Sequence, residues 1–375
     1  MMNPLWLSKG YYASSEILGL LPPKLQVWLS SFGRSIFMEQ FVKHVPKPTA
    51  LPDSSLKVSA WGLNFRSSLM NSAGMFKNGE GYDVIEALGA GGYIGGTSTT
   101  NWRRGNEKLC IKLPSIILPK SKMAVNWLGL PNLGDGVLAK QSFTANKKSD
   151  CPIGWSVMRS PDFNESQGVQ LLIESLWLYH EHPQIDFIEI NESCPNVKNG
   201  GGSIIPRLQL ISDKFANLRR RNLPLIVKLS NDLTPDIVKE LIPHLIRLGF
   251  DGVNLGNTST MYNNYSHKLM DSERDLFDYF TNQFGGGVSG TMLKQSSLAL
   301  CRAAAEEVEK LKPNHEFHII RSGGINSAQD LIESSQNGVT LNQWYTGFFE
   351  NFNKDGYSVY HKLYADLLCL NKQRK

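Results

Sequence analysis

Residues 225–257 read LIVKLSNDLTPDIVKELIPHLIRLGFDGVNLGN, and this stretch decides the fold class. Leu225–Leu229 and Gly252–Leu255 are short apolar runs typical of buried strands. Asp236–Leu248 lies between them and has the apolar spacing of a helix. A strand, a helix and a second strand in this order indicate a βαβ unit, in which the two strands lie parallel in one sheet.

The same alternation runs along most of the chain and predicts a (β/α)8 barrel of the α/β class. The expected strands are Ser68–Ala73, Gly92–Thr97, Ile153–Val157, Asp186–Asn191, Leu225–Leu229, Gly252–Leu255, His318–Ser322 and Val339–Tyr345. Further helical stretches are Val169–Leu178, Ser297–Leu311 and Ala328–Ser335. A small hairpin around Gly62 is expected before the first strand. We therefore predict a barrel domain over residues 51–375.

The first 50 residues differ from the rest and predict a small helical extension, which ends at the Pro-rich linker 45–48. After Pro22-Pro23, one face of a helix carries Leu25, Trp28, Leu29, Phe32 and Ile36. The favoured interpretation is that two short amphipathic helices cap the barrel and bury this apolar face on it. The alternative is a membrane-surface or quinone-collecting lid, because Trp and Phe beside Lys and Arg suit an interface.

Composition narrows the class of protein. Of the 375 residues, 41% are apolar and 19% are charged, so a large core is available and disorder is disfavoured. The formal charge of +5 suits an anionic ligand but is too small and dispersed for nucleic acid. Five cysteines without a CxxC pair favour a reducing compartment, and no metal site is expected. No signal peptide or membrane-spanning segment is predicted.

Polar residues or glycines follow nearly all the expected strands, where active sites of barrel enzymes lie. The sharpest stretch is Asn191-Glu192-Ser193-Cys194-Pro195-Asn196. A loop Cys between two amides can be a general base or nucleophile, whereas one Cys considered alone is more often buried and inert. Lys228 interrupts an apolar strand, and a charge there needs a partner, for which a structural ion pair is one possibility. Gly323-Gly324, with Ser327 starting the next helix, predicts a phosphate site.

Together these loops resemble those of the dihydroorotate dehydrogenase family, from about Leu56 to Leu370. The motifs that carry the resemblance, in order, are SAGMFKNGE at 72–80, NWLGLPN at 126–132, NESCPN at 191–196, Val227-Lys228, Asn257-Thr258, GGVSG at 286–290, SGG at 322–324 and Tyr345-Thr346. The resemblance implies FMN as the cofactor and oxidation of dihydroorotate to orotate in pyrimidine biosynthesis. It also implies that Cys194 removes the C5 proton while flavin N5 takes the C6 hydride.

The resemblance assigns further residues to two groups. Those implied to bind substrate are Lys77, Asn126, Gly129, Leu130, Asn191, Asn196, Asn257 and Thr258. Those implied to bind FMN are Ala73, Gly74, Thr97, Asn126, Ser156, Asn191, Lys228, Ser289, Gly290, Gly323, Gly324, Tyr345 and Thr346. The chemistry agrees, because amides match the ring edges of a cyclic diamide and a lysine matches its carboxylate. Beside a flavin, Lys228 would stabilise the negative charge of the reduced ring, and we favour this interpretation over a structural ion pair.

The electron acceptor is open between two classes. In the family a Cys base accompanies soluble enzymes that use fumarate or NAD, whereas a Ser base and a helical extension accompany membrane-associated enzymes that use quinone. This chain combines Cys194 with an extension. We favour quinone and peripheral contact of residues 1–50 with the cytoplasmic side of a membrane, and a soluble cytoplasmic protein is the alternative.

Some residues depart from the family pattern. Glu192, Met158 and Arg321 stand where an apolar residue, a Gly and a small residue are usual, and the stretch 261–284 is polar. These departures leave room for altered specificity. One competing function is another FMN barrel oxidoreductase, acting on a related dihydropyrimidine or on uridine in RNA. The other is a non-catalytic, membrane-associated barrel.

Overall fold

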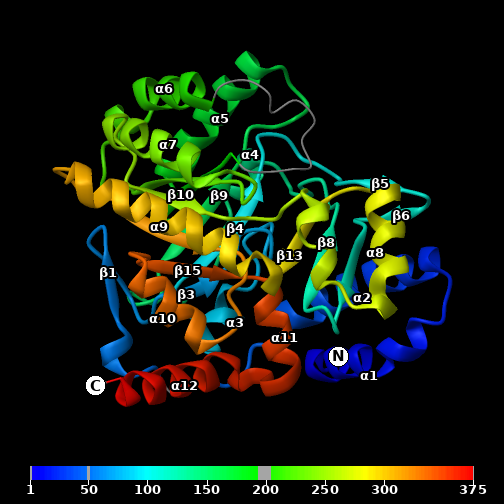
Figure 1. Ribbon diagram of the computed structural model, residues 1–375. Coiled ribbons are helices and arrows are strands. Elements are labelled where there is room, and N and C mark those ends of the chain that lie inside the picture. The colour runs from blue at the N-terminus through cyan, green and yellow to red at the C-terminus, as the bar shows by residue number, and fades with distance from the viewer. Residues whose placement is uncertain (1, 49–50, 193–203, 375) are drawn as a thin grey trace.

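The computed structural model describes residues 2–48, 51–192 and 204–374. Eight parallel strands form one sheet in the order β3-β15-β14-β12-β11-β10-β9-β4, and a bridge between Met70 and Gly92 joins the two end strands into a barrel (Figure 1). The strands are β3 Leu69–Asn71, β4 Tyr93–Ser98, β9 Ile153–Val157, β10 Phe187–Asn191, β11 Leu225–Leu229, β12 Gly252–Leu255, β14 His318–Ser322 and β15 Leu341–Trp344. All eight predicted strands are confirmed, and only their ends differ.

Helices surround the barrel and shield its strands from water (Figure 1). They are α3 Tyr82–Ala87, α4 Asp135–Leu138, α5 Glu165–His180, α6 Ile204–Lys214, α7 Pro235–Arg247, α9 Lys294–Leu311, α10 Ala328–Gln336, α11 Thr346–Asp355 and α12 Val359–Gln373. Helix α7 shows why these segments are helical. Thr234 caps it by accepting from the Ile237 amide, Pro235 begins it, and its buried residues recur at helical spacing.

The end of the barrel at which the strands begin is closed by packed side chains. Ile94, Phe187 and Ile226 fill the interior and contact Trp61 and Phe65 from the predicted N-terminal hairpin. The hairpin consists of β1 Val58–Ala60 and β2 Leu63–Phe65. Each large apolar side chain buried in this way contributes about 1.5–3 kcal/mol. Because the described side chains seal this end, the open route to the barrel interior lies at the carboxyl ends of the strands.

The N-terminal extension forms α1 Pro4–Leu18 and α2 Pro23–Lys43, which confirms the predicted pair of helices. The prediction that the Leu25–Ile36 face packs on the barrel is wrong, since Leu25, Trp28 and Phe32 are exposed at 41%, 43% and 53%. The helix is seated instead by Phe41, whose ring lies against Phe348 and Phe352 of α11. Aromatic partners on the barrel thus select a different face from the one that periodicity suggested.

A small antiparallel sheet lies beside the barrel mouth and under the extension. Its strands are β7 Ser115–Leu118, β8 Met123–Asn126 and β13 Gly287–Gly290, and a hairpin of β5 Glu107–Lys108 and β6 Ile111–Lys112 adjoins it. The polar stretch 261–284 contains two 3-10 turns and helix α8 Asp271–Gln283, which buries Phe277 and Phe280 against this sheet. Within the described residues no helix is long and apolar enough to cross a membrane.

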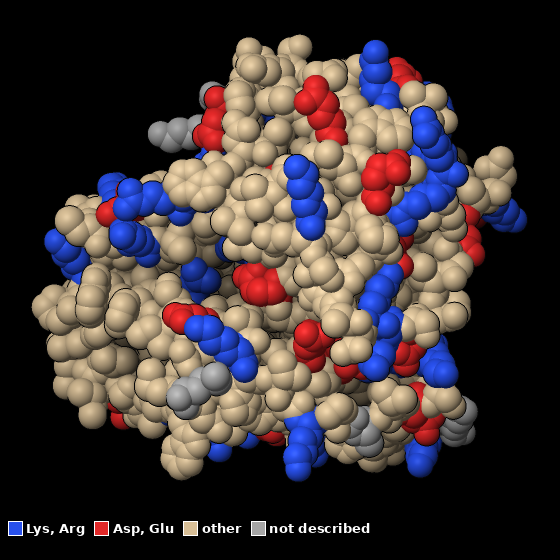
Figure 2. All heavy atoms as spheres, turned by 180° about the vertical axis from the view of Figure 1, so that it is seen from behind, with Lys and Arg blue, Asp and Glu red and all other residues tan. Residues whose placement is uncertain are grey.

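The arrangement of charged side chains on the surface agrees with the small net charge of the chain. Seen from behind, basic and acidic side chains are interspersed, and the region of α1 and α2 is largely uncharged (Figure 2).

Candidate active site

A cavity of about 1000 Å³, including its open part, lies at the carboxyl ends of the barrel strands. The predicted site residues that line it are Ala73, Gly74, Lys77, Thr97, Asn126, Gly129, Leu130, Asn191, Asn257, Thr258, Ser289, Gly290, Gly323, Gly324, Tyr345 and Thr346. These residues come from separate loops, so the fold brings together most of the predicted site.

One side of the cavity presents amides and a cation. Lys77 follows β3, Asn126 ends β8, Asn191 ends β10 and Asn257 follows β12. The Asn191 amide donates to Thr97 Oγ1 at 3.1 Å, which orients its carbonyl oxygen as an acceptor. Such a group of amides and one lysine suits a planar ring with N–H and C=O edges and a carboxylate.

Cys194 and Asn196 lie outside the described residues, but the residue next to their loop is described. Glu192 is buried and accepts from Arg207 Nη2 at 3.0 Å, and Arg207 Nη1 contacts Glu165 at 2.7 Å. Burial raises the pKa of Glu192, and the Arg207 guanidinium opposes that rise. The extra charge in the NESCPN stretch is therefore balanced by Arg207.

Lys228 is buried behind the cavity and does not line it. Its ammonium donates to Gln343 Oε1 at 3.1 Å and lies 3.5 Å from Glu189 Oε1. Glu189 also accepts from Asn254 Nδ2 at 2.6 Å and from Gln343 Nε2 at 2.8 Å. The structural ion pair, the less favoured interpretation of Lys228, is therefore present. Gln343, which does line the cavity, connects this pair to the cavity.

Ser156 also lies one layer back, with its hydroxyl 2.9 Å from Thr97 Oγ1. Sequence reasoning missed Gln343 and Glu189, although each is a polar residue inside an otherwise buried strand. A polar residue in a buried strand is the same signal that marks Lys228, and it is present in the sequence at both positions. Ser72 and Ser322, which both contact Gln343, were placed only in motifs.

The opposite side of the cavity is built from backbone. Gly323 and Gly324 adopt φ of 94° and 82°, and a Cβ on Gly324 would lie 2.4 Å from Lys294 Cα. A Cβ on Gly347, near the start of α11, would lie 2.1 Å from the Ile325 carbonyl oxygen. Only glycine allows the backbone at Gly324 to approach Lys294, and the backbone at Gly347 to approach Ile325, so closely. The N-terminus of α11, which has no side-chain cap, faces this cradle and suits an anion.

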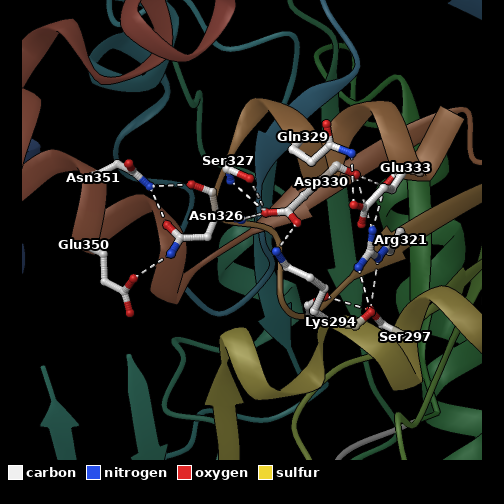
Figure 3. A network of polar contacts seen from close by, with 12 residues as sticks. Lys294, Ser297, Arg321, Asn326, Ser327, Gln329, Asp330, Glu333, Glu350 and Asn351 are labelled. Carbon is white, nitrogen blue, oxygen red and sulfur yellow. Dashed lines mark hydrogen bonds and ion pairs between the residues drawn. The ribbon is translucent and has the colours of Figure 1, made fainter. Parts of the chain in front are cut away.

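The N-terminus of α10 is already occupied by a carboxylate. Ser327 begins this helix as predicted, and Asp330 Oδ2 accepts from the amides of Asn326 and Ser327 at 3.0 and 2.8 Å (Figure 3). Lys294 Nζ lies 2.5 Å from Asp330 Oδ1. The backbone donors open to a phosphate are therefore those of the glycine turn and α11, not those of α10.

A second cavity, of about 1150 Å³ including its open part, lies between the extension and the small sheet. Its lining is mostly apolar and includes Leu7, Ile36, Phe37, Met38, Ile116, Ile117, Val125 and Phe349. Arg34 also lines it, and Arg34 Nε is buried with no hydrogen-bond partner within the described chain. Both cavities are lined by Asn126, Leu128, Ser289, Tyr345 and Thr346.

The family model for dihydroorotate dehydrogenase matches residues 55–368. The chain belongs to the dihydroorotate dehydrogenase family. The expected oxidoreductase of this flavin-dependent family is thereby confirmed, as is the family resemblance of the loops.

Relatives with assigned names agree with the dihydroorotate dehydrogenase family. A dihydroorotate dehydrogenase (quinone) of Shewanella sp. (strain ANA-3) is 28% identical over 300 residues, which cover 78% of this chain and 81% of that protein. One from Aeromonas hydrophila is 28% identical over 302 residues, covering 78% and 82%. The structure of a DHODH from Eimeria tenella in complex with ferulenol superposes with a TM-score of 0.74 at 20% identity, covering 92% of both chains. The last similarity concerns the fold.

Proposed function

We propose that this protein is an FMN-dependent dihydroorotate dehydrogenase that transfers electrons from dihydroorotate to a quinone. The observation that carries the proposal is the pair of cavities that meet at Asn126, Leu128, Ser289, Tyr345 and Thr346. The cavity with amides and a lysine suits a charged heterocycle, and the apolar cavity suits a quinone ring and tail. The quinone named as acceptor in the relatives supports this assignment.

The barrel mouth fits FMN. The Gly323-Gly324 turn and the N-terminus of α11 would hold the phosphate, since both line the cavity, the turn carries no Cβ atoms and the helix start has no side-chain cap. Lys228, with Gln343, would lie near the flavin pyrimidine ring and stabilise negative charge there. FMN, when bound, supplies the N5 atom that accepts a hydride.

The chain's own residues bind the substrate and move its proton. Oxidation removes a proton from C5 and a hydride from C6 of dihydroorotate, which leaves the C5–C6 double bond of orotate. We assign the proton to the Cys194 thiolate and the substrate carboxylate to Lys77. The amides of Asn126, Asn191, Asn257 and Asn196 hold the ring, and this positioning supplies much of the rate gain.

The surface of the extension supports peripheral contact with a membrane, which we propose to be on its cytoplasmic side. The exposed residues there include Trp6, Ile17, Leu20, Trp28 and Phe32, and a quinone is itself a membrane solute. Because the second cavity lies directly beneath α1 and α2, a quinone can enter it from that surface.

An anaerobic titration of the purified holoprotein with L-dihydroorotate tests the proposal. We expect the visible absorbance band of the oxidised flavin to bleach and to recover on adding a short-chain quinone. Recovery with fumarate or NAD alone would overturn the acceptor. A flavin band that dihydroorotate leaves unchanged would overturn the substrate, and a protein that binds no flavin would support a non-catalytic barrel.

A further inference from the structure

Arg321 is a fully buried cation on β14, directly before the Ser322-Gly323-Gly324 turn. Neighbouring residues Ile320 and Ser322 face the barrel interior, so Arg321 faces outward between α9 and α10 (Figure 3). Its Nε donates to Ser297 Oγ at 3.0 Å. Its Nη1 donates to Ser334 Oγ at 2.9 Å, and its Nη2 donates to the Lys294 carbonyl at 2.8 Å.

All these acceptors are uncharged, and no ion pair of Arg321 exists within the described ranges 2–48, 51–192 and 204–374. The Asp330 carboxylate, which is close by, is taken by Lys294 Nζ and by the Ser327 hydroxyl at 2.8 Å. Burial lowers the pKa of Arg321, but a guanidinium stays protonated in proteins. The Asp330 and Glu333 carboxylates oppose this fall in the pKa, but neither forms an ion pair with Arg321: Lys294 binds Asp330, and Gln329 donates to Glu333 at 3.0 Å. A buried cation without a direct ion pair is costly, and the N-terminus of α9 adds positive partial charge nearby.

The cation is also linked to the glycine turn that we assign to phosphate. Ser297 Oγ, which accepts from Arg321, donates to the Gly323 carbonyl at 2.8 Å. Lys294, whose carbonyl Arg321 binds, has its Cα against Gly324. Arg321 therefore holds both residues of the turn through one intermediate residue each.

We propose that Arg321 is a positioning residue that makes the flavin site selective for a phosphorylated flavin. It fixes the Gly323-Gly324 turn, and its positive charge adds to the attraction for a phosphate monoester in the cradle. This role rests on the FMN binding proposed above and goes beyond it, because the family resemblance leads one to expect a small, uncharged residue at this position.

The test compares FMN with riboflavin, which lacks the phosphate, as ligands of the apoprotein. Dissociation constants are measured by flavin fluorescence quenching for the unchanged protein and for R321Q, R321K and R302Q. R321Q keeps an N–H donor and loses the charge, whereas R321K keeps the charge. R302Q is the matched control, because it removes a charge from the exposed surface of the same helix that Arg321 contacts.

We expect R321Q to weaken FMN binding about tenfold, which corresponds to about 1.4 kcal/mol, and to leave riboflavin binding within about twofold. R321K should keep most of the preference for FMN, and R302Q should keep all of it. An equal loss for both flavins in R321Q, or no loss, would overturn the proposal.

Two further results have defined meanings. If the unchanged protein binds riboflavin as tightly as FMN, or binds neither flavin, then the cofactor assignment itself fails. If R321Q loses folded structure by circular dichroism, R321M replaces it, since an apolar side chain suits a buried position between helices. The ratio of the two dissociation constants in R321M then decides in the same way.

Discussion

The buried pair of Lys228 and Glu189 gives a prediction whose size follows from the structure. Both side chains are nearly inaccessible, at 2% and 0% exposure, and their charges lie 3.5 Å apart. The variant K228M would leave the Glu189 carboxylate buried without its counter-charge. Removing one partner of a buried pair costs about 3–5 kcal/mol. Asn254 and Gln343 still donate to Glu189, so we expect the lower end of that range, about 3 kcal/mol.

The double variant K228M/E189Q separates the charge from the packing. A neutral amide at position 189 no longer needs a cation, so we expect the double variant to regain about 2 kcal/mol relative to K228M. Urea unfolding of the apoprotein, followed by circular dichroism, measures these differences without a contribution from bound flavin. K362M is a suitable control, because the Lys362–Asp366 pair is exposed and should change stability by less than about 0.5 kcal/mol.

This reasoning would be refuted if the losses of stability in K228M and E189Q were strictly additive. If K228M/E189Q were as unstable as the sum of K228M and E189Q, the two charges would not interact, and Lys228 would have to be stabilised by Gln343 alone.

Three other predictions concern the site and the thiols. C194S should retain FMN and slow flavin reduction by dihydroorotate about 10²–10⁴-fold in anaerobic stopped flow, and an unchanged rate would remove Cys194 as the base. G324A should abolish FMN binding in equilibrium dialysis, because its Cβ would meet the backbone of Lys294 at 2.4 Å; retained binding would contradict the phosphate cradle. Burial raises the pKa of Cys151 and of Cys301 to about 12, so native protein at pH 8 should resist iodoacetamide at both while exposed cysteines react. Because ionisation is favoured only after unfolding, both thiols should lower stability as pH rises above the ordinary thiol range, and rapid native alkylation of either would refute their burial.

The barrel could be predicted from the sequence because its signals are local. Each strand is a short apolar run, and each helix such as α7 repeats its buried residues within a few turns. The face that α2 presents to the barrel could not be predicted, because it depends on Phe348 and Phe352, which are hundreds of positions away. Periodicity identified an apolar stripe, but tertiary packing decided which stripe is buried.

The same difference between local signals and long-range contacts applies to the site. Glycines and asparagines of the loops could be placed because the carboxyl ends of parallel strands meet at one end of a barrel. The partners of Lys228 could not be predicted, since no local sequence pattern connects Glu189 on β10 with Gln343 on β15. The acceptor cavity was also beyond the sequence, because one of its sides comes from α1 and α2 and the other from the small sheet.

The separation of the acceptor cavity from the substrate cavity has a kinetic consequence. Dihydroorotate would enter through the polar mouth and quinone through the apolar one, so neither molecule has to leave before the other binds. Orotate that lingers in its own compartment would then not compete with quinone for space. Its effect on the second half-reaction would be confined to the residues that line both cavities, of which Asn126 is the one whose side-chain amide can bind either ligand.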